Sequence, residues 1–242
     1  MFDTERSIDT LPPTTATTRT PPDAPAAPAR RDWLREASGL AALATVAGVA
    51  GLAATPAFAQ GAGYLTLEAP LGTRDPSRIE VLEFFWFGCP HCFRFEPTIN
   101  AWAASRPDDV DFVREAPPLN PGWENHSRAF YAAEALGITD GMFDETFHRI
   151  HDEGESLRKP ADVGEFIASL DLGTDADTFV STMRSFTVET ALRHSVKLAT
   201  DARVTGVPSL LINGRYLTSA SVAGGNDGMI RVLDDLIVRE RG

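Results

Sequence analysis

The stretch RIEVLEFFWFGCPHCFRFEP (Arg78–Pro97) joins two different sequence patterns and contains both cysteines of the 242-residue chain. Residues 78–87 form an almost continuous apolar run, which is typical of a central strand that is buried on both faces. From Pro90 onwards the pattern becomes helical. The stretch therefore predicts a buried strand that passes through the motif CPHC, residues 89–92, directly into a helix.

Further strand patterns lie on both sides of this stretch. VDFVRE at 110–115 predicts a second central strand, and the order strand, helix, strand predicts a right-handed βαβ unit with parallel strands. GYLTLE at 63–68 alternates like a short edge strand. Near the C-terminus, SLLIN at 209–213 and RYLTS at 215–219 are joined through Asn-Gly, a strong hairpin signal. Strands therefore cluster towards both ends of the chain.

The sequence between these two groups of strands is mostly helical, and it begins after APPLNPG at 116–122. The helical patterns cover residues 123–136, 140–151, 160–170, 175–186 and 188–202, followed by a last amphipathic helix at 229–239. This arrangement predicts one mixed sheet, built from both ends of the folded chain, with a helical subdomain inserted between them.

The N-terminal 59 residues differ from the rest in composition. Residues 1–29 are rich in Pro, Thr and Ala without an apolar period, so we expect them to be disordered. An arginine pair at 30–31 then precedes an uncharged stretch at 37–58, and AFA at 57–59 has the small-x-small pattern of a cleavage site. The segment resembles a twin-arginine signal peptide, with a Sec signal or a retained membrane anchor as alternatives.

The expected location and the charge limit the possible functions. Cleavage after Ala59 would leave the mature chain in the periplasm, which is oxidising, so that a disulfide can persist there. A net charge of −12 and a pI of about 4.8 give no electrostatic support for binding nucleic acid. With 43% hydrophobic residues, the chain is apolar enough to fold.

The two cysteines stand where a strand ends and a helix begins. The backbone N–H groups of the first helical turn and the helix dipole there favour the thiolate of Cys89. Cys92, one turn further in, is expected to be more buried, so we predict Cys89 as the nucleophile and Cys92 as the resolving thiol. Pro90 loses no hydrogen bond at the first helical position, and His91 adds a donor or a positive charge near the Cys89 sulfur.

These effects act on one redox state only. They stabilise a thiolate and do nothing for a disulfide, so they favour the reduced protein and make a Cys89–Cys92 disulfide a strong oxidant. A purely structural disulfide is disfavoured, because closing so small a loop restrains little of the unfolded chain. Zinc normally takes four ligands, and no second cysteine pair or nearby histidine pair supplies them, so no metal site is predicted. The remaining histidines are expected at the surface or at helix ends: His126, His148, His151 and His194.

The mature chain resembles the DsbA-type thiol:disulfide oxidoreductases of the thioredoxin-fold superfamily. The resemblance rests on GYLTLEAP, VLEFFWFGCPHCFRFEP, VDFVRE and TGVPSLLINGRY, which follow that family's order over nearly all of residues 60–242. CPHC is the DsbA-like choice of dipeptide, whereas thioredoxins carry CGPC. The resemblance implies an α/β fold, a thioredoxin-like mixed sheet with an inserted helical subdomain. The sheet would come from 60–115 and 188–242, and the insertion from 116–187.

The resemblance also implies a second element of the site, opposite the cysteines. In thioredoxin-like folds a cis proline faces the CxxC motif, and Pro208 in TGVPS matches that position. The backbone of Val207 would then lie beside Cys89 and pair with an extended substrate strand. Trp86 and Gly88, just before the motif, replace other residues of the family.

Three charged residues match family positions close to the cysteines. Glu83 stands inside an apolar strand, where a charge is costly unless it is functional or paired, and the resemblance implies that it relays the proton of Cys92. Glu96 and Arg114 occupy the neighbouring charged positions and would modulate the site, with a solvated ion pair as the alternative.

Together these features predict a monomeric, exported dithiol oxidase that donates its Cys89–Cys92 disulfide to reduced, unfolded exported proteins. No cofactor is implied, and the resemblance implies reoxidation by a quinone-linked membrane protein of the DsbB type. A disulfide reductase or isomerase of the same fold is an alternative, although such isomerases usually add a dimerisation domain. A peptide-binding chaperone or a metal carrier is the alternative of a different class.

Overall fold

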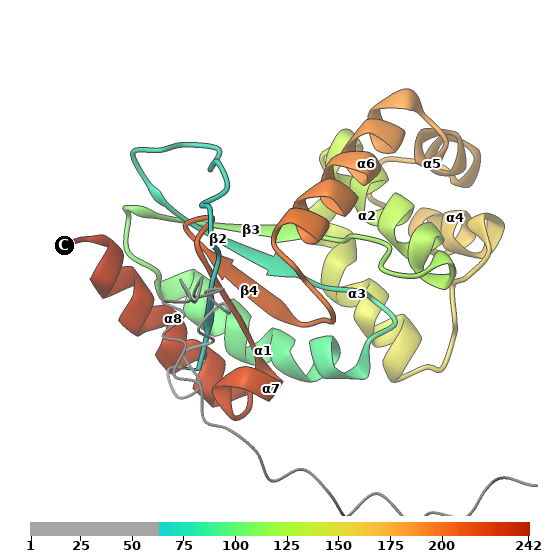
Figure 1. Cartoon of the computed structure of the whole chain (residues 1–242). Coiled ribbons are helices and arrows are strands. Elements are labelled where there is room, and N and C mark those ends of the chain that lie inside the picture. The colour runs from blue at the N-terminus through green and yellow to red at the C-terminus, as the bar shows by residue number, and fades with distance from the viewer. Residues whose placement is uncertain (1–62) are drawn as a thin grey trace, which may run out of the picture. The chain divides into compact units, whose positions relative to one another are not determined.

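The computed structural model of the chain describes residues 63–242 (Figure 1). The expected disorder of residues 1–29, the twin-arginine-like signal and the cleavage after Ala59 lie outside the described residues. Within the described part, no helix is both long enough and apolar enough to cross a membrane.

A five-stranded sheet with the strand order β1-β5-β4-β2-β3 forms the centre of the described chain. The strands are β1 Leu65–Thr66, β2 Ile79–Phe84, β3 Val110–Glu115, β4 Ser209–Ile212 and β5 Tyr216–Ser219. β2 and β3 are parallel, as the βαβ pattern predicts, and β5 is antiparallel to both β1 and β4. β4 is antiparallel to β2 as well, so the predicted mixed sheet is confirmed.

The structure contains each predicted helix and adds two short ones, at 121–123 and 220–223, that the sequence pattern does not predict. The helices are α1 Pro90–Ser105, η1 Pro121–Trp123, α2 Glu124–Leu136, α3 Thr139–His151, α4 Pro160–Ser169, α5 Ala176–Met183, α6 Phe186–Asp201, α7 Ala220–Ala223 and α8 Asn226–Glu240. Helix α6 belongs to both parts of the molecule. Its first turns pack in the core of the helical insertion through Val188 and Leu192, and its last turn packs on the sheet through Ala199.

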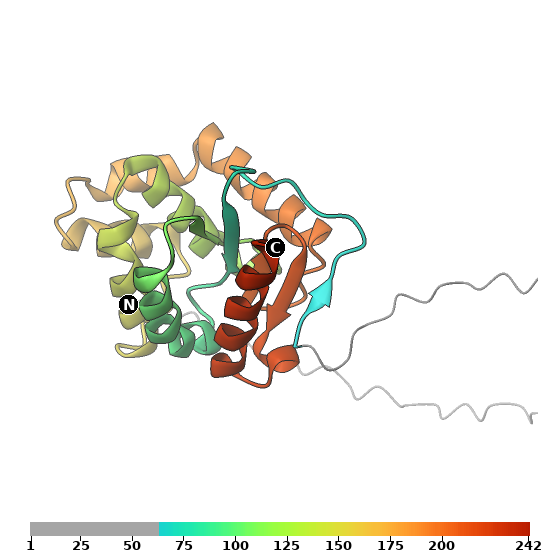
Figure 2. The ribbon, with the colours of Figure 1, turned by 90° about the vertical axis from the view of Figure 1, so that its left-hand side faces the viewer.

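Two layers of helix cover the sheet, one on each face. Helices α1 and α8 lie side by side on one face, where Phe95 and Leu233 pack with Val81 of β2 (Figures 1 and 2). The end of α6 covers the other face, against Leu82 and Phe84. Val81 and Leu82 point to opposite faces and are both buried, which explains why apolar residues follow one another in β2 and do not alternate with polar ones.

The strand that leads to CPHC is shorter than its apolar run suggests, because β2 ends at Phe84. Phe85 and Phe87 turn into the helical insertion instead. The ring of Phe85 lies 5.1 Å from that of Phe130, and the ring of Phe87 lies 5.3 Å from that of Phe143. The core of the sheet and the core of the helical insertion are both apolar, so the sequence pattern cannot show where the strand ends. The predicted edge strand at 63–68 likewise pairs only over its two central residues.

Candidate active site

The CPHC motif lies at the point where the sheet, helix α1 and the helical insertion meet. Cys89 is the N-cap of α1, with an extended backbone conformation, and Pro90 is the first helical residue. The backbone N–H of Cys89 donates to the carbonyl oxygen of Trp86 at 2.9 Å, and its carbonyl oxygen accepts from Phe93 at 3.0 Å. The cysteine thus closes the turn between strand and helix, with the unpaired N–H groups of the first helical turn beside it.

The two thiols, both free, have opposite electrostatic environments. A hydrogen bond from the Cys92 thiol, helped by the backbone N–H groups of Cys92 and His91, lowers the pKa of Cys89 to about 6. Burial raises the pKa of Cys92 well above its ordinary value, and this side chain is fully enclosed. Near neutral pH the pair therefore holds one thiolate, on Cys89, and one proton, on Cys92.

His91 contributes less to Cys89 than its place in the motif suggests. Its charge is the smallest of the effects that lower the pKa of Cys89, behind the Cys92 thiol and the backbone N–H groups. The ring is exposed, and its Nδ1 accepts a hydrogen bond from Arg94 at 2.8 Å, since a guanidinium can only donate. The Cys92 thiol and the backbone N–H groups, and not the imidazole, supply most of the stabilisation of the thiolate.

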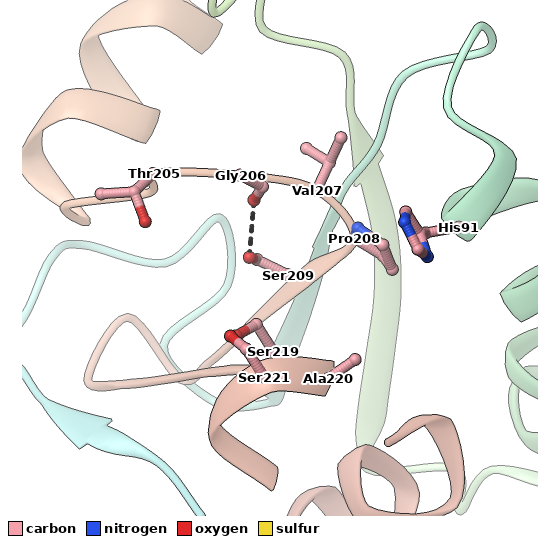
Figure 3. Close-up of a pocket in the computed structure, with 9 residues that line it drawn as sticks. All are labelled: His91, Thr205, Gly206, Val207, Pro208, Ser209, Ser219, Ala220 and Ser221. Atoms are coloured by element: carbon pink, nitrogen blue, oxygen red, sulfur yellow. Dashed lines mark hydrogen bonds between the residues drawn. The ribbon is translucent and has the colours of Figure 1, made fainter. Parts of the chain in front are cut away.

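The loop before β4 faces the motif. The Val207–Pro208 peptide bond is cis, and the carbonyl oxygen of Val207 lies 3.6 Å from the Cys89 sulfur, from which it accepts a hydrogen bond when Cys89 is protonated. A cavity of about 250 Å³ opens beside this loop, with His91 on one side and the start of α7 on the other (Figure 3). Its lining residues are His91, Thr205, Gly206, Val207, Pro208, Ser209, Ser219, Ala220 and Ser221.

A buried group of charges, which we call the Arg114 cluster, lies between β2, β3 and α1. Arg114 donates from Nε to Glu83 at 3.0 Å and from Nη2 to Glu96 at 2.9 Å, and it also donates to Asn100. The second carboxylate oxygen of each glutamate has no partner. Both glutamates are buried, which excludes the alternative of a solvated ion pair.

The Arg114 cluster has more carboxyl groups than its one cation can balance. Burial raises the pKa of Glu83 against the effect of Arg114, and burial together with the charge of Glu83 raises the pKa of Glu96. One carboxyl group of the pair therefore keeps its proton at neutral pH. The charge of Glu83 also contributes to the raised pKa of Cys92, which places this carboxyl group close enough to affect that sulfur.

Two histidines are not the surface or capping residues that we expected from the sequence. His126 is only 3% exposed, and its Nε2 donates to the carbonyl oxygen of Ser156 at 2.9 Å. His151 is partly buried: its Nε2 donates to the carbonyl oxygen of Phe87 at 2.8 Å, and its ring stacks on Phe93. His126 stacks on Trp86 and His151 stacks on Phe93 and Phe147, contacts that the position of a histidine in a helical pattern does not reveal.

His148 and His194 are exposed, as expected. Among the described residues, no group of three or more histidine, cysteine, aspartate or glutamate side chains is arranged to hold a metal ion.

Sequence reasoning also missed the neighbours of Trp86. Its indole stacks on Trp123 with ring centroids 4.4 Å apart, and the ring of His126 lies 5.8 Å away. Trp123 is 37 positions further along the chain, in a different element, so no local pattern could have paired the two. Only the tryptophan itself, at an unusual place before the motif, was visible as a departure from the family.

Comparisons with known proteins agree with this geometry. A family model described as DSBA-like thioredoxin domain matches residues 80–236. The chain is 39% identical over 182 residues to the thiol:disulfide interchange protein DsbA of Azotobacter vinelandii, covering 75% of this chain and 84% of that protein. It is 38% identical over 185 residues to the protein of that name from Pseudomonas aeruginosa strain PAO1, covering 76% and 86%.

Solved structures show the same likeness. The crystal structure of Pseudomonas aeruginosa DsbA is 37% identical and superposes with a TM-score of 0.70, covering 74% of this chain and 92% of that one. The oxidoreductase DsbA from Xylella fastidiosa is 28% identical, with a TM-score of 0.69, and covers 74% and 95%.

Proposed function

This chain belongs to the DsbA-like thioredoxin family and is a thiol:disulfide oxidoreductase, and from this premise we propose that it works as a dithiol oxidase. The observation that carries the proposal is the difference between the two thiols: the pKa of Cys89 is lowered to about 6, while the pKa of Cys92 is raised. The groups that stabilise the Cys89 thiolate have no comparable effect on a disulfide. The reduced form is therefore favoured, and the oxidised form gives its disulfide away.

The size of this preference follows from linkage between ionisation and redox state. Above the pKa of the thiol, each unit of pKa depression stabilises the reduced protein by about 1.4 kcal/mol. In a two-electron couple this energy corresponds to about 30 mV. The Cys92 thiol, the strongest single influence on the pKa of Cys89, exists only in the reduced protein, so its hydrogen bond stabilises the reduced form alone.

The exchange proceeds in two steps. A substrate thiolate attacks Cys89 of the disulfide, the sulfur–sulfur bond breaks, and Cys92 leaves with the electron pair and takes up a proton. A second thiolate of the substrate then attacks the substrate sulfur of the mixed disulfide and releases Cys89 as its stabilised thiolate. The substrate dithiol loses two electrons and becomes a disulfide, and the cysteine pair of the protein gains them. In this proposal Glu83 relays to Cys92 the proton that the Arg114 cluster holds.

The substrates in this proposal are reduced, unfolded exported proteins. An unfolded chain offers an extended backbone, which can pair with the loop at Val207, beside the carbonyl oxygen that already contacts Cys89. Reoxidation would need a membrane partner linked to quinones, and the protein would act as a monomer without a cofactor in the periplasm.

The direction of the reaction is tested by equilibrating the purified mature protein with glutathione buffers and counting free thiols. We expect the reduced form to persist until the buffer is strongly oxidising, and the oxidised form to introduce disulfides into a reduced, unfolded substrate. A strongly reducing couple would contradict the oxidase and favour a reductase. Activity towards unfolded substrates that persists in a variant without both cysteines would favour a peptide-binding chaperone.

The order of the thiols has its own test. Cys89→Ser should abolish the exchange. The reduced Cys92→Ala protein, mixed with a substrate that carries a disulfide, should accumulate mixed disulfides, because the Cys89 thiolate can still attack the substrate disulfide while no Cys92 thiol is present to release it. Mass spectrometry should find the trapped substrate on Cys89. In the oxidised wild-type protein, an adduct carried by Cys92 would reverse the assignment.

The export route is tested in the precursor. Replacing the arginine pair at residues 30–31 with lysine should leave the precursor unprocessed in the cytoplasm if the twin-arginine route is used. Normal processing and export of this variant would point to the Sec route instead.

A further inference from the structure

Trp86 takes no part in the exchange chemistry, and yet its backbone contacts both cysteines. Its carbonyl oxygen accepts a hydrogen bond from the backbone N–H of Cys89 at 2.9 Å. Burial raises the pKa of Cys92, and the backbone N–H of Trp86 opposes that rise, so this donor lies against the Cys92 sulfur. A displacement of residue 86 therefore changes the surroundings of both thiols at once.

The indole of Trp86 is held by the helical insertion. It stacks on Trp123, the last residue of η1, with ring centroids 4.4 Å apart and ring planes 5° apart. It also stacks on His126 of α2, at 5.8 Å and 28°. A Cβ atom at residue 88 would lie 2.3 Å from the indole carbon Cζ2, so only glycine lets the ring lie across the backbone here. We call Trp86, Trp123 and His126 the aromatic stack.

Two polar atoms of the aromatic stack are buried and lack a hydrogen-bond partner. His126 donates from Nε2 to the carbonyl oxygen of Ser156, which leaves Nδ1 as an acceptor, and burial lowers the pKa of His126 so that its ring is neutral. That Nδ1 and the Nε1 of Trp86 are both buried without a partner. Unpaired buried polar atoms cost free energy.

We propose that Trp86 is a positioning residue for the Cys89–Cys92 couple, and that the aromatic stack sets how strongly the couple oxidises. Strand β2 ends at Phe84, and the last backbone hydrogen bond to β3 runs from the N–H of Phe85 to the carbonyl oxygen of Glu115 at 3.0 Å. His151 donates to the carbonyl oxygen of Phe87, and the stack is the attachment that holds residue 86 itself to the helical insertion. The proposal rests on thiol:disulfide exchange at this motif, but it does not depend on the direction of the exchange.

Removing the indole tests the proposal. In Trp86→Ser the freed segment lets the backbone N–H groups and the Cys92 thiol move away from the Cys89 sulfur. The pKa of Cys89 should rise by about one unit, and the equilibrium constant with glutathione should shift roughly tenfold towards the disulfide. Trp86→Phe keeps an aromatic ring against Trp123 and should restore most of both values. The measurements are thiolate absorbance against pH and free-thiol counts in glutathione buffers.

A double-mutant cycle with Gly88 separates positioning from general damage. Gly88→Ala places a methyl group where the indole lies, so by itself it should displace the ring and shift the couple in the same direction as Trp86→Ser. In the Trp86→Ser background the ring is gone, and Gly88→Ala should then have no further effect. Additive shifts in the double mutant would overturn the steric coupling between the two positions, and with it the proposal.

Trp102 provides the matched control. This tryptophan lies on α1, donates to Asp234 of α8 at 2.9 Å and packs edge-on against Phe112, away from the motif. Trp102→Ser should reduce stability without changing the pKa of Cys89 or the equilibrium constant with glutathione.

If Trp86→Ser does not fold, Trp123→Leu removes the same stacking and takes its place. A folded Trp86→Ser or Trp123→Leu protein with an unchanged Cys89 pKa and an unchanged equilibrium would show that the stack is packing alone. The wild-type couple, measured in the same buffers, reports separately on the oxidase proposal.

Discussion

Two arginines, each shared by two buried glutamates, lie on opposite faces of the sheet. The Arg114 cluster faces α1, beneath the cysteines. On the face covered by α6, Arg74 donates to Glu80 at 3.2 Å and to Glu115 at 2.6 Å, and we call these three residues the Arg74 cluster. The clusters use the same two strands, because neighbouring residues of a strand point to opposite faces. Composition alone does not distinguish them.

Their surroundings do distinguish them. The side chain of Arg74 is 48% exposed, and Glu115 also accepts a hydrogen bond from the hydroxyl group of Tyr131 at 2.8 Å. The side chain of Arg114 is 20% exposed, and the two glutamates of its cluster each keep an unpaired oxygen and a raised pKa. Burial and missing hydrogen-bond partners, and not the number of charges, therefore keep one carboxyl group of the Arg114 cluster protonated beneath Cys92.

The largest expected difference between the clusters is in stability. Arg114→Met leaves buried carboxyl groups without their cation, which should lower the free energy of unfolding by about 3–5 kcal/mol. Arg74→Met should cost about 1–2 kcal/mol, because water reaches the vacated site and Glu115 keeps its bond from Tyr131. Urea unfolding of both variants at pH 7 gives the comparison. Equal losses of unfolding free energy in the two variants would show that the two arginines contribute equally to stability.

The next difference is in the rate of exchange. If Glu83 supplies the proton to Cys92, Glu83→Gln should slow the reaction of the oxidised protein with a reduced peptide by about a hundredfold, within the usual range for general acid catalysis. Glu80→Gln, on the other face of the same strand, is the matched control and should leave the rate unchanged. Stopped-flow measurement across pH separates the two. A Glu83→Gln protein that reacts at the wild-type rate throughout would remove the relay from the mechanism.

The parts of the site that sequence reasoning located are those with local patterns. The CPHC motif between a strand and a helix, the βαβ order and the Asn-Gly hairpin each depend on residues a few positions apart, and the structure has them where expected. Pro208 was placed by the family's TGVPS pattern, and its peptide bond is cis. The buried position of Glu83 followed from a charge in an apolar strand.

The parts that sequence reasoning missed are contacts between distant elements. Trp86 meets Trp123 and His126 only because the insertion folds back onto the motif, so neither neighbour could be named in advance. The end of β2 at Phe84 was hidden because the aromatic residues after it enter a second apolar core. The smaller effect of His91 likewise depends on where its ring points, which its place in the motif does not fix.

The two faces of the sheet should also differ in the highest pH at which stability still falls with rising pH. Glu96 binds a proton in the folded protein above the ordinary glutamate pKa of about 4.3. Stability therefore falls as the pH rises from the ordinary glutamate pKa to the raised pKa of Glu96, by up to about 1.4 kcal/mol per pH unit for one proton. Glu96→Gln should flatten this fall into the alkaline range. Unfolding measured at pH 5, 7 and 9 gives the slope.

On the other face, Glu134 of α2 is exposed overall, but partial desolvation of its carboxyl group and then the charge of Glu115 raise its pKa to about 7. Glu134→Gln should therefore flatten the fall only below about pH 7 and leave the alkaline part unchanged. The same fall above pH 7 in the Glu96→Gln protein and the wild type would contradict the raised pKa of Glu96.

The smallest expected difference is in the response to salt. Half of the Arg74 side chain is in contact with water, so counterions reach its ion pairs, and at 1 M salt the screening length shrinks to about 3 Å. The destabilisation caused by Arg74→Met should therefore shrink by a few tenths of a kcal/mol between 0.05 and 1 M sodium chloride. Arg114 is mostly enclosed and its partners are buried, so the loss in Arg114→Met should stay constant over the same range.

The measurement is the difference in unfolding free energy between each variant and the wild type at both salt concentrations, because the difference cancels the general effect of salt on the fold. A salt-sensitive loss in Arg114→Met would mean that water and ions enter the space under Cys92, and the pKa values of Glu83 and Glu96 would then have no reason to be raised.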